Sequence, residues 1–425
     1  MKRVVILGAG FGGLRAARKI DRGIKHLGLK DRYSVVLIDR NDHQVYTPLL
    51  YEAATTSKET ANLADLHNIV TYDIRSLLRG SSIEFLQTEV GSLDLPNGRV
   101  LRDGGQETKA DYLVVALGSE PNYFDIPGLR ERALPFKTMK DAIAIRDAVW
   151  NRVMEGDRSI RIVIGGAGPS GVELAGEMKV WCGELDQEFK NCNLDITLVE
   201  ASQTVMPGFD ARVVRTAQKR LAKLGVHLLE GQKIMSVAEH AVNLDKRGEL
   251  PFDILIWTGG VKAPDVLARS PLKTESRGRI EVAHRMECLP QTPDLKLHGK
   301  IYGLGDSICF YDSKTGAPVP GVARAALIQA DVVAQNILHH IALEEQLKHV
   351  PKRHTYEPTS YPYVTPIGGK YAIAKIGPLV FSGFPAWFFK GIVELNYLLS
   401  IMPPLKAIRT WLMGLKVFIQ NDRLG

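Results

Sequence analysis

The hydrophobic residues near the start of the chain form short unbroken runs. Residues 2–7 and 34–39 are mostly β-branched or aliphatic, as expected for strands that are buried on both faces of a parallel sheet. A glycine-rich stretch follows the first run, and a helical pattern extends from about residue 12 to residue 20. The segment 81–115 is rich in strand-forming residues and ends in another apolar run. These elements predict an α/β unit with a parallel sheet.

The same order of elements begins again in the middle of the chain. An apolar run at 159–164, a glycine-rich stretch, a helical pattern at 172–181 and an apolar run at 195–200 repeat the first unit. Residues 252–260 repeat the run that ends the segment 81–115. The repeating unit has the size of a whole nucleotide-binding domain, which is longer than the roughly 20- to 50-residue repeats of solenoids.

The last third of the chain has a different pattern. A strand that ends in Gly305 and Asp306 is followed by a predicted helix from about residue 322 to residue 340. The tail, residues 381–418, is rich in aromatic and aliphatic residues but carries charged residues throughout. Two consecutive prolines in its middle predict that it forms two helices, because proline disrupts a helix interior.

Composition narrows the class of protein. A chain of 425 residues is long enough for two or three domains. Its 54 basic and 47 acidic residues give a net charge of +7, which argues against a dedicated nucleic-acid binder and suits contact with anionic cofactors and an anionic membrane surface. No stretch of about 20 residues is free of charge, so we expect no membrane-spanning helix. We also predict no metal site.

The cysteines indicate a reducing environment. The chain has four, and they are too few and too scattered for a disulfide framework. None forms a Cys-x-x-Cys pair, which is the usual sequence sign of dithiol redox chemistry. A cytoplasmic setting fits this usage best.

The first glycine-rich stretch has the GxGxxG pattern of a dinucleotide-binding loop. Gly8 permits the tight turn, Gly10 lets a pyrophosphate approach the backbone, and Gly13 lets the helix pack closely on the strand. The helix that follows presents free N–H groups to the phosphate. Asp39 ends the second strand, where a carboxylate accepts hydrogen bonds from ribose hydroxyls. The interval from Gly13 to Asp39 is slightly longer than usual, which predicts a longer helix or loop between them.

The second glycine-rich stretch repeats this arrangement. Gly166, Gly168 and Gly171 take the same positions, and Glu200 is the corresponding acid. No Arg or Lys follows Glu200 closely, and an acid at this place repels a 2′-phosphate, so we expect NADH to be preferred over NADPH. Two dinucleotide sites indicate electron transfer, because a flavin accepts hydride from a nicotinamide stacked on its ring. Spacing alone leaves open which site holds which cofactor.

The order of these motifs resembles the two-dinucleotide flavoproteins of glutathione-reductase-like fold. The resemblance implies two Rossmann-like domains, the second inserted in the first, and a C-terminal tail of amphipathic helices. It assigns FAD to residues 1–118 and 278–345, NADH to residues 119–277, and the tail to residues 346–425. The Gly-Asp pair at 305–306 resembles the second FAD fingerprint of that superfamily; the alternative for Asp306 is an N-cap of the following turn.

Within that superfamily the chain resembles the type II NADH dehydrogenases, which are single-subunit NADH:quinone oxidoreductases. The more specific similarities are the Pro-Asn-Tyr-Phe segment at 121–124, the Gly-Val-Glu-Leu-Ala segment at 171–175 and the tail. The implied FAD contacts are Gly8, Gly10, Phe11, Gly12, Gly13, Asp39, Arg40, Pro48, Val90, Ala116, Gly118, Gly305, Asp306 and Ala323. The implied NADH contacts are Gly166, Gly168, Pro169, Gly171, Glu200, Gly259 and Gly260.

The resemblance also implies catalytic residues. Glu173 lies two residues past the last loop glycine, where the family has a carboxylate that faces the nicotinamide–flavin contact and the proton route to quinone. The alternative for Glu173 is a favourable charge at the positive end of a helix. Lys370 resembles a family lysine near the flavin ring, where a cation stabilises negative charge on reduced flavin. The alternative for Lys370 is a solvated surface lysine.

Arg324 departs from the family pattern. The family has a glutamine here, beside the flavin and the quinone head, so a cation replaces an amide. Two roles for Arg324 stay open: a hydrogen bond to an oxygen of an unusual quinone, or a pair with an acid such as Glu173. The type of quinone stays open with them.

The tail resembles the monotopic membrane anchor of this family. Its apolar residues recur at roughly helical spacing from Trp387 to Phe418, and Lys406, Arg409 and Lys416 are expected at lipid headgroups. The alternative is a helix that packs on the protein body or on a dimer partner.

The implied function is that of an FAD-dependent NADH:quinone oxidoreductase that pumps no protons. It is expected to be a homodimer, peripherally bound to the cytoplasmic face of the cell membrane. One alternative is a sulfide:quinone reductase, which needs a close cysteine pair near the flavin; Cys288 and Cys309 lie outside the positions that such a pair requires. A soluble disulfide reductase lacks its Cys-x-x-Cys motif. A further alternative is an NADH-sensing flavoprotein that binds a partner through the tail.

Overall fold

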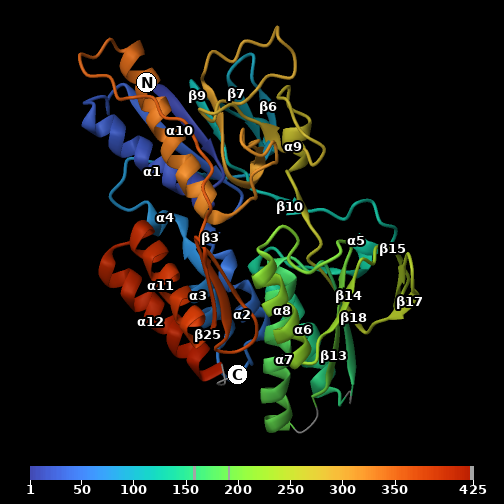
Figure 1. Cartoon of the computed structure of the whole chain (residues 1–425). Helices are drawn as coiled ribbons and strands as arrows, with labels where there is room; N and C mark the ends of the chain where they lie inside the picture. The colour runs from blue at the N-terminus through green and yellow to red at the C-terminus, as the bar shows by residue number, and fades with distance from the viewer. Residues whose placement is uncertain (157–158, 190–191, 422–425) are drawn as a thin grey trace. The chain divides into compact units, whose positions relative to one another are not determined.

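A computed structural model describes residues 1–156, 159–189 and 192–421. The chain folds into two compact units, and each is built from three separate segments (Figure 1). The first unit consists of residues 1–44, 72–120 and 261–361. The second consists of residues 45–71, 121–260 and 362–425. The short strands at the crossings between the units are β3 (His43–Val45), β4 (Thr71–Asp73), β10 (Glu120–Pro121) and β19 (Val261–Lys262).

The first unit is organised around a five-stranded parallel sheet. Its strands, in spatial order, are β21 (Ile301–Gly303), β9 (Tyr112–Val115), β1 (Lys2–Leu7), β2 (Tyr33–Asp39) and β5 (Glu84–Gln87). The central strand is the predicted one, and its four apolar residues from Val4 to Leu7 are fully buried, as expected for an inner parallel strand. The unit also contains β6 (Val90–Asp94), β7 (Arg99–Arg102), β8 (Gln106–Lys109), β20 (Ile280–Glu281), β22 (Ile308–Cys309), α4 (Ile74–Leu77), α9 (Asp265–Ala268), η2 (Asp103–Gly105) and η3 (Gly305–Ser307).

Two long helices of this unit pack side by side. They are α1 (Phe11–His26) and α10 (Ala323–Glu344) (Figure 1). Gly23 permits their close approach, because a Cβ there would meet the side chain of Leu338. Arg15 of α1 also forms a bidentate ion pair with Asp331 of α10, with nitrogen–oxygen distances of 2.6 and 2.7 Å. α1 extends past the predicted end near residue 20, which accounts for the long interval before Asp39.

The second unit repeats the plan of the first. Its parallel sheet contains β11 (Leu134–Pro135), β18 (Ile254–Trp257), β12 (Ile160–Gly165), β13 (Leu194–Glu200) and β14 (His227–Glu230), in that order. The helix after the second glycine loop is α7 (Pro169–Phe189). The three-stranded sheet of β15 (Ile234–Val237), β16 (Ala241–Leu244) and β17 (Gly248–Pro251) matches β6–β8 of the first unit in order and antiparallel pairing. The predicted repeat of a whole nucleotide-binding domain is thus confirmed. The segment 121–260 of this unit also contains the helices α5 (Leu129–Arg132), α6 (Met139–Met154) and α8 (Ala211–Lys223).

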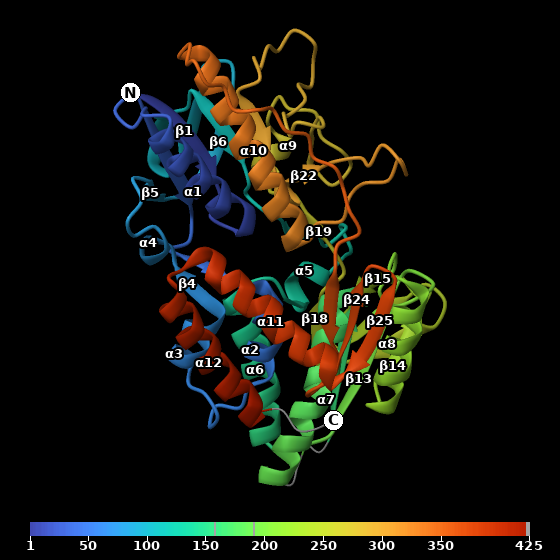
Figure 2. The same ribbon diagram turned by 60° about the vertical axis from the view of Figure 1, so that its left-hand side comes forward.

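The C-terminal region belongs to the second unit. It comprises β23 (Tyr363–Pro366), β24 (Ala372–Ile376), β25 (Leu379–Gly383), α11 (Phe384–Ile401) and α12 (Pro404–Asn421). The two helices pack on each other, and α12 also contacts α3 (Leu63–Val70) (Figure 2). The segment before α3 forms η1 (Thr47–Leu49) and α2 (Leu50–Thr55). The helix break falls at the two prolines, as predicted.

The two tail helices have an exposed apolar surface. On α11, Phe388 and Ile392 are 53% and 48% exposed, whereas Trp387 and Leu398 of the predicted apolar pattern are buried. On α12, Leu405 is 85% exposed. The side chain of Phe418 lies outside the described part. Within residues 1–156, 159–189 and 192–421, no helix has the length and apolar character to cross a bilayer.

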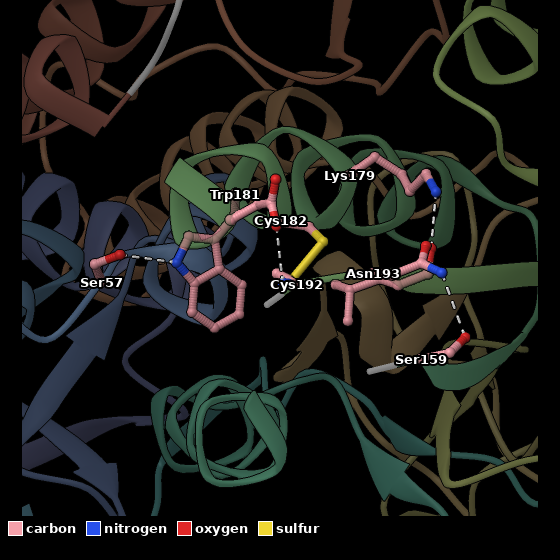
Figure 3. The surroundings of a disulfide bond; sticks show 9 residues. Ser57, Ser159, Lys179, Trp181, Cys182, Cys192 and Asn193 are labelled. Atoms are coloured by element: carbon pink, nitrogen blue, oxygen red, sulfur yellow. Dashed lines mark hydrogen bonds between the residues drawn. A yellow bond between two sulfur atoms is a disulfide. The ribbon is translucent and has the colours of Figure 1, made fainter. Parts of the chain in front are cut away.

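A disulfide joins Cys182, in the second half of α7, to Cys192 in the connection to β13 (Figure 3). This single pair is not a disulfide framework, and it was not predicted, because its spacing of 10 residues matches no common motif. The neighbouring Trp181 is buried and donates its indole N–H to Ser57 at 3.0 Å. The disulfide therefore closes the end of α7 where the helix is already held by buried contacts.

Candidate dinucleotide and catalytic sites

The two glycine loops have nearly the same geometry. Gly8 and Gly166 each have φ of +101°, a conformation that side chains rarely adopt. A Cβ at Gly13 would collide with the carbonyl oxygen of Gly8, and a Cβ at Gly171 would collide with that of Gly166. These contacts explain why the turn and the close helix–strand packing require glycine.

The middle glycine of each loop borders open space. A Cβ at Gly10 or at Gly168 would meet no atom within 4 Å, so the surface in front of each loop has room for a ligand. Each glycine comes just before a long helix, since α1 begins at Phe11 and α7 begins at Pro169. An open backbone at a helix N-terminus fits the pyrophosphate of a dinucleotide.

The predicted acids lie against these loops. Asp39 accepts the backbone N–H of Ala9 at 2.7 Å and that of Asn41 at 2.8 Å. In the second unit, Glu200 accepts the N–H of Ala167 at 2.8 Å and that of Ser202 at 2.8 Å. Each carboxylate is thus fixed at the end of its strand beside a glycine loop.

The second loop is also closed by a residue that the sequence analysis did not single out. The hydroxyl of Thr258, just after β18, donates to the carbonyl oxygens of Gly165 and Gly166, at 3.1 and 2.7 Å respectively. The predicted contacts Gly259 and Gly260 follow Thr258 in sequence, and the carbonyl of Gly260 accepts the N–H of Asn122 at 3.0 Å. The end of β18 is therefore tied to the loop that starts α7.

A third group of predicted residues lies at the end of β21. Asp306 accepts the hydroxyl proton of Ser119 at 2.9 Å. The N-cap of η3 is Leu304, so Asp306 is not the cap that the alternative required. Ser307 bridges to Gly118, whose N–H it accepts at 2.8 Å. Neither serine was among the predicted cofactor contacts, because a single serine beside a glycine-rich turn is too common to be a signal.

The other predicted FAD contacts are distributed over both units. Ala116 and Val90 are buried in the first unit, and Ala323 begins α10. Arg40 is exposed and lies 3.5 Å from Glu89 and 3.4 Å from Glu120. Pro48 is in η1 of the second unit. The role of this set in FAD binding stays a prediction.

Arg324 is the second residue of α10 in the first unit, and it is exposed. The first turn of this fully described helix contains no acidic residue. A cation at the positive end of a helix is unfavourable for the helix. Arg324 therefore does not serve helix stability, and its charge is available to an electron-rich group.

Glu173 is the fifth residue of α7, which begins at Pro169. The electrostatic effect of a helix end falls off within the first turn, which weakens the alternative that Glu173 only stabilises the helix. Burial among protein atoms raises the pKa of Glu173 to about 8, partly opposed by the positive charge of Lys390 and reinforced by Glu52. Its surface is partly exposed, so the carboxyl combines a desolvated environment with access to a ligand.

Lys370 lies in the tight loop between β23 and β24 and is partly buried. Two residues that sequence reasoning missed hold this loop. Arg220 of α8 donates to the carbonyls of Ile367 and Gly368 at 3.0 and 2.7 Å. Glu177, one turn after Glu173 on α7, accepts the N–H of Gly369 at 3.3 Å.

The close approach of this loop to α7 depends on Gly176. A Cβ there would press on Ile367 and Gly368. Gly176 is therefore required for this packing. The loop of Lys370 and the carboxyl of Glu173 are positioned by the same helix.

Comparison with known proteins identifies the class. Residues 2–330 match the pyridine nucleotide-disulphide oxidoreductase family, and the chain belongs to that family. It is 28% identical to the type II NADH:quinone oxidoreductase Ndh of Mycobacterium tuberculosis, over 96% of this chain and 87% of that protein. It is also 28% identical to the demethylphylloquinone reductase NdbB of Synechocystis, over 79% of this chain and 78% of that protein.

Solved structures agree on the fold. The NDH2 protein of Plasmodium falciparum, in complex with NADH, superposes with a TM-score of 0.80 at 16% identity, covering 100% of this chain and 99% of that chain. The sulfide:quinone oxidoreductase of Aquifex aeolicus superposes with a TM-score of 0.74 at 19% identity, covering 94% of this chain and 91% of that chain. The α/β fold with a helical C-terminal region, expected from the sequence, is confirmed.

Proposed function

We propose that the protein is an FAD-dependent NADH:quinone oxidoreductase of the type II class. The observation that carries the proposal is the pair of glycine loops, each closed by a carboxylate that accepts the N–H of its own loop at 2.7 or 2.8 Å. FAD, when bound, supplies the electron carrier between nicotinamide and quinone. The curated relatives named above support NADH and a quinone as the two substrates.

The balance of the reaction defines what the protein must add. NADH and a quinone give NAD⁺ and quinol, and hydride provides two electrons but only one of the two hydrogens of the quinol. One further proton must therefore come from solvent through the protein. Glu173 suits this role, because a carboxyl whose pKa is about 8 still holds its proton at neutral pH.

We assign two cations to the balancing of negative charge. Lys370, in the loop between β23 and β24, would supply positive charge to the reduced cofactor. Arg324 would donate a hydrogen bond to a quinone oxygen. Both are preorganised, since one lies in a tight loop and the other at a helix start. Proton pumping is excluded from the proposal because it would require a path across the bilayer, and we assign the tail to the membrane surface.

We assign the exposed apolar residues of α11 and α12 to the lipid interface. Lys406, Arg409 and Lys416 are exposed on α12, and basic side chains beside an apolar surface suit anionic headgroups. The proposed location is the cytoplasmic face of the membrane, with a homodimer presenting two tails.

The cysteines argue against a sulfide or disulfide reductase. Cys182 lies 13 residues after Pro169 in α7, which is about 20 Å along a helix from the glycine loop. The disulfide is thus distant from the nicotinamide loop of its own unit. Burial raises the pKa values of Cys288 and Cys309, which disfavours the reactive thiolate.

The proposal is tested on protein purified in detergent. The expected result is a bound flavin spectrum, bleaching by NADH far faster than by NADPH, and turnover with ubiquinone or menaquinone analogues. Purified protein that carries no flavin, or that bleaches but passes electrons to none of the quinones, would overturn it.

A further inference from the structure

Lys390 of α11 makes a buried ion pair within the second unit. Its ammonium group lies 2.6 Å from a carboxylate oxygen of Glu52 on α2, and the two side chains are 11% and 2% exposed. Lys390 also donates to the hydroxyl of Tyr51, which in turn donates to the same oxygen of Glu52 at 2.7 Å. The second oxygen of Glu52 is buried and has no hydrogen-bond partner among the described residues.

This pair is surrounded by more acids than it can neutralise. Glu394 follows Lys390 by four residues on α11, so the two share one helix face, and Glu394 is 7% exposed. Glu173 lies on α7, which packs on α2, and the charges of Lys390 and Glu52 both act on it. One ammonium group thus acts on three carboxyl groups. A low-dielectric site holds one carboxylate against one cation and keeps further acids protonated.

The pKa of Glu394 agrees with an excess of carboxyl groups over ammonium groups at this site. Burial raises the pKa of Glu394 to about 7, and the influence of Lys390 and Glu52 on it has the same signs as on Glu173. Of the other neighbours, Tyr46 has a pKa raised by burial and by Glu394 and Tyr397. Arg146 of α6, which packs on α2, is paired with Asp147 at 3.2 Å.

We propose that Lys390 and Glu52 are positioning residues that set the protonation of Glu173, and that Glu394 is a second buried proton carrier under the influence of the same pair. The inference rests on the proposed function for its use, because the proton in question is the one that completes the quinol. Under this proposal α11, which carries Lys390 and Glu394, takes part in proton transfer as well as forming part of the tail. The proton leaves the Glu173 carboxyl, and Glu173 regains one from Glu394 or from water.

Because Lys390 and Glu52 have opposite charges, removing one or the other should change the pKa of Glu173 in opposite directions. Lys390→Met removes a charge that lowers the pKa of Glu173, so this pKa should rise by about one unit or more. Glu52→Gln removes a charge that raises it, so the pKa should fall. In the double variant the two changes should largely cancel. Lys390→Arg keeps the positive charge, so the pKa of Glu173 in this variant should stay near its value in the unmodified protein.

The primary readout is infrared titration of the protonated carboxyls, in which the band lost in Glu173→Gln identifies Glu173 and the band lost in Glu394→Gln identifies Glu394. Lys223→Met removes one exposed charge from α8 and is the matched control, expected to shift nothing. The inference is overturned if the pKa of Glu173 does not change in Lys390→Met and Glu52→Gln, or if it changes in the same direction in both.

Quinone turnover against pH then tests the link to function. The alkaline limit of quinone turnover should move upward in Lys390→Met and downward in Glu52→Gln. Glu394→Gln should lower turnover most above pH 7. The infrared titration needs no quinone, so its failure counts against the charge cluster, whereas a protein with the expected infrared shifts and no quinone turnover counts against the proposed function.

Discussion

The carboxylate of Glu200 accepts a hydrogen bond from the backbone N–H of Ala167 at 2.8 Å, and this contact fixes the acid beside the second glycine loop. Glu200 is 8% exposed, so its charge acts in a partly desolvated environment. The ribose-binding position of the loop is therefore negative before any ligand arrives, and a 2′-phosphate placed there would be repelled.

We predict that Glu200→Gln relaxes the choice of nucleotide. The variant removes the negative charge but keeps the size of the side chain, so bleaching by NADPH should speed up about tenfold, which corresponds to about 1.4 kcal/mol. Stopped-flow bleaching with both nucleotides measures the ratio. Asp39→Asn is the matched control in the first unit: it should weaken FAD retention and leave the ratio unchanged. An unaltered ratio in Glu200→Gln would remove this residue from nucleotide selection.

The raised pKa of Glu173 predicts a pH dependence of stability. In the unfolded chain the carboxyl ionises near its ordinary pKa of 4.5, and in the folded protein near 8. Between these values the folded state binds the extra proton, so folding stability falls as pH rises through this window. Glu173→Gln cannot ionise, and its melting temperature should exceed that of the unmodified protein more at pH 8.5 than at pH 4. Equal differences at both pH values would mean that Glu173 is ionised in the folded state.

Arg324→Gln should separate the two halves of the reaction. Because Arg324 lies at the exposed start of α10 and is assigned to the quinone, its loss should change kcat or KM for quinones while flavin bleaching by NADH is unaffected. The measurement is steady-state turnover with ubiquinone and menaquinone analogues. Quinone kinetics identical to the unmodified protein would exclude Arg324 from the quinone site.

The disulfide predicts a stability effect without a catalytic one. Cys192→Ser opens a loop of 10 residues, for which chain entropy gives a loss of about 2 to 3 kcal/mol. NADH bleaching should persist, since the bond lies far along α7 from the glycine loop. Thiol labelling of unfolded protein should find Cys288 and Cys309 without reductant and all four cysteines with it. Four reactive thiols before reduction would show that the bond does not form in solution.

Membrane binding should depend on single apolar residues of α12. Leu405→Asp replaces an 85% exposed leucine and should weaken binding to anionic vesicles about tenfold or more, as expected for loss of one buried leucine side chain. Met235→Asp, at a 55% exposed position of β15, is the control and should bind normally. Equal loss in both variants would point to general destabilisation instead of a lipid contact.

The glycine loops and their acids could be predicted from sequence because each is a local pattern with one chemical purpose. The contacts that hold Lys370 could not, since Arg220 and Ile367 are separated by 147 residues and neither belongs to a motif. The pair of Lys390 and Glu52 spans 338 residues, and its lysine looks from sequence like another charge in an amphipathic tail. Only the fold shows that this lysine is turned inward.

The pairing of α1 with α10 has a consequence for biosynthesis. Arg15 and Asp331 are 316 residues apart, so at about 5 to 20 residues per second a ribosome takes roughly 15 to 60 seconds to deliver the second helix after the first. During that time the face of α1 that carries Gly23 has no partner helix to cover it. The first segment of the chain must therefore be kept from aggregation until most of the chain has been synthesised.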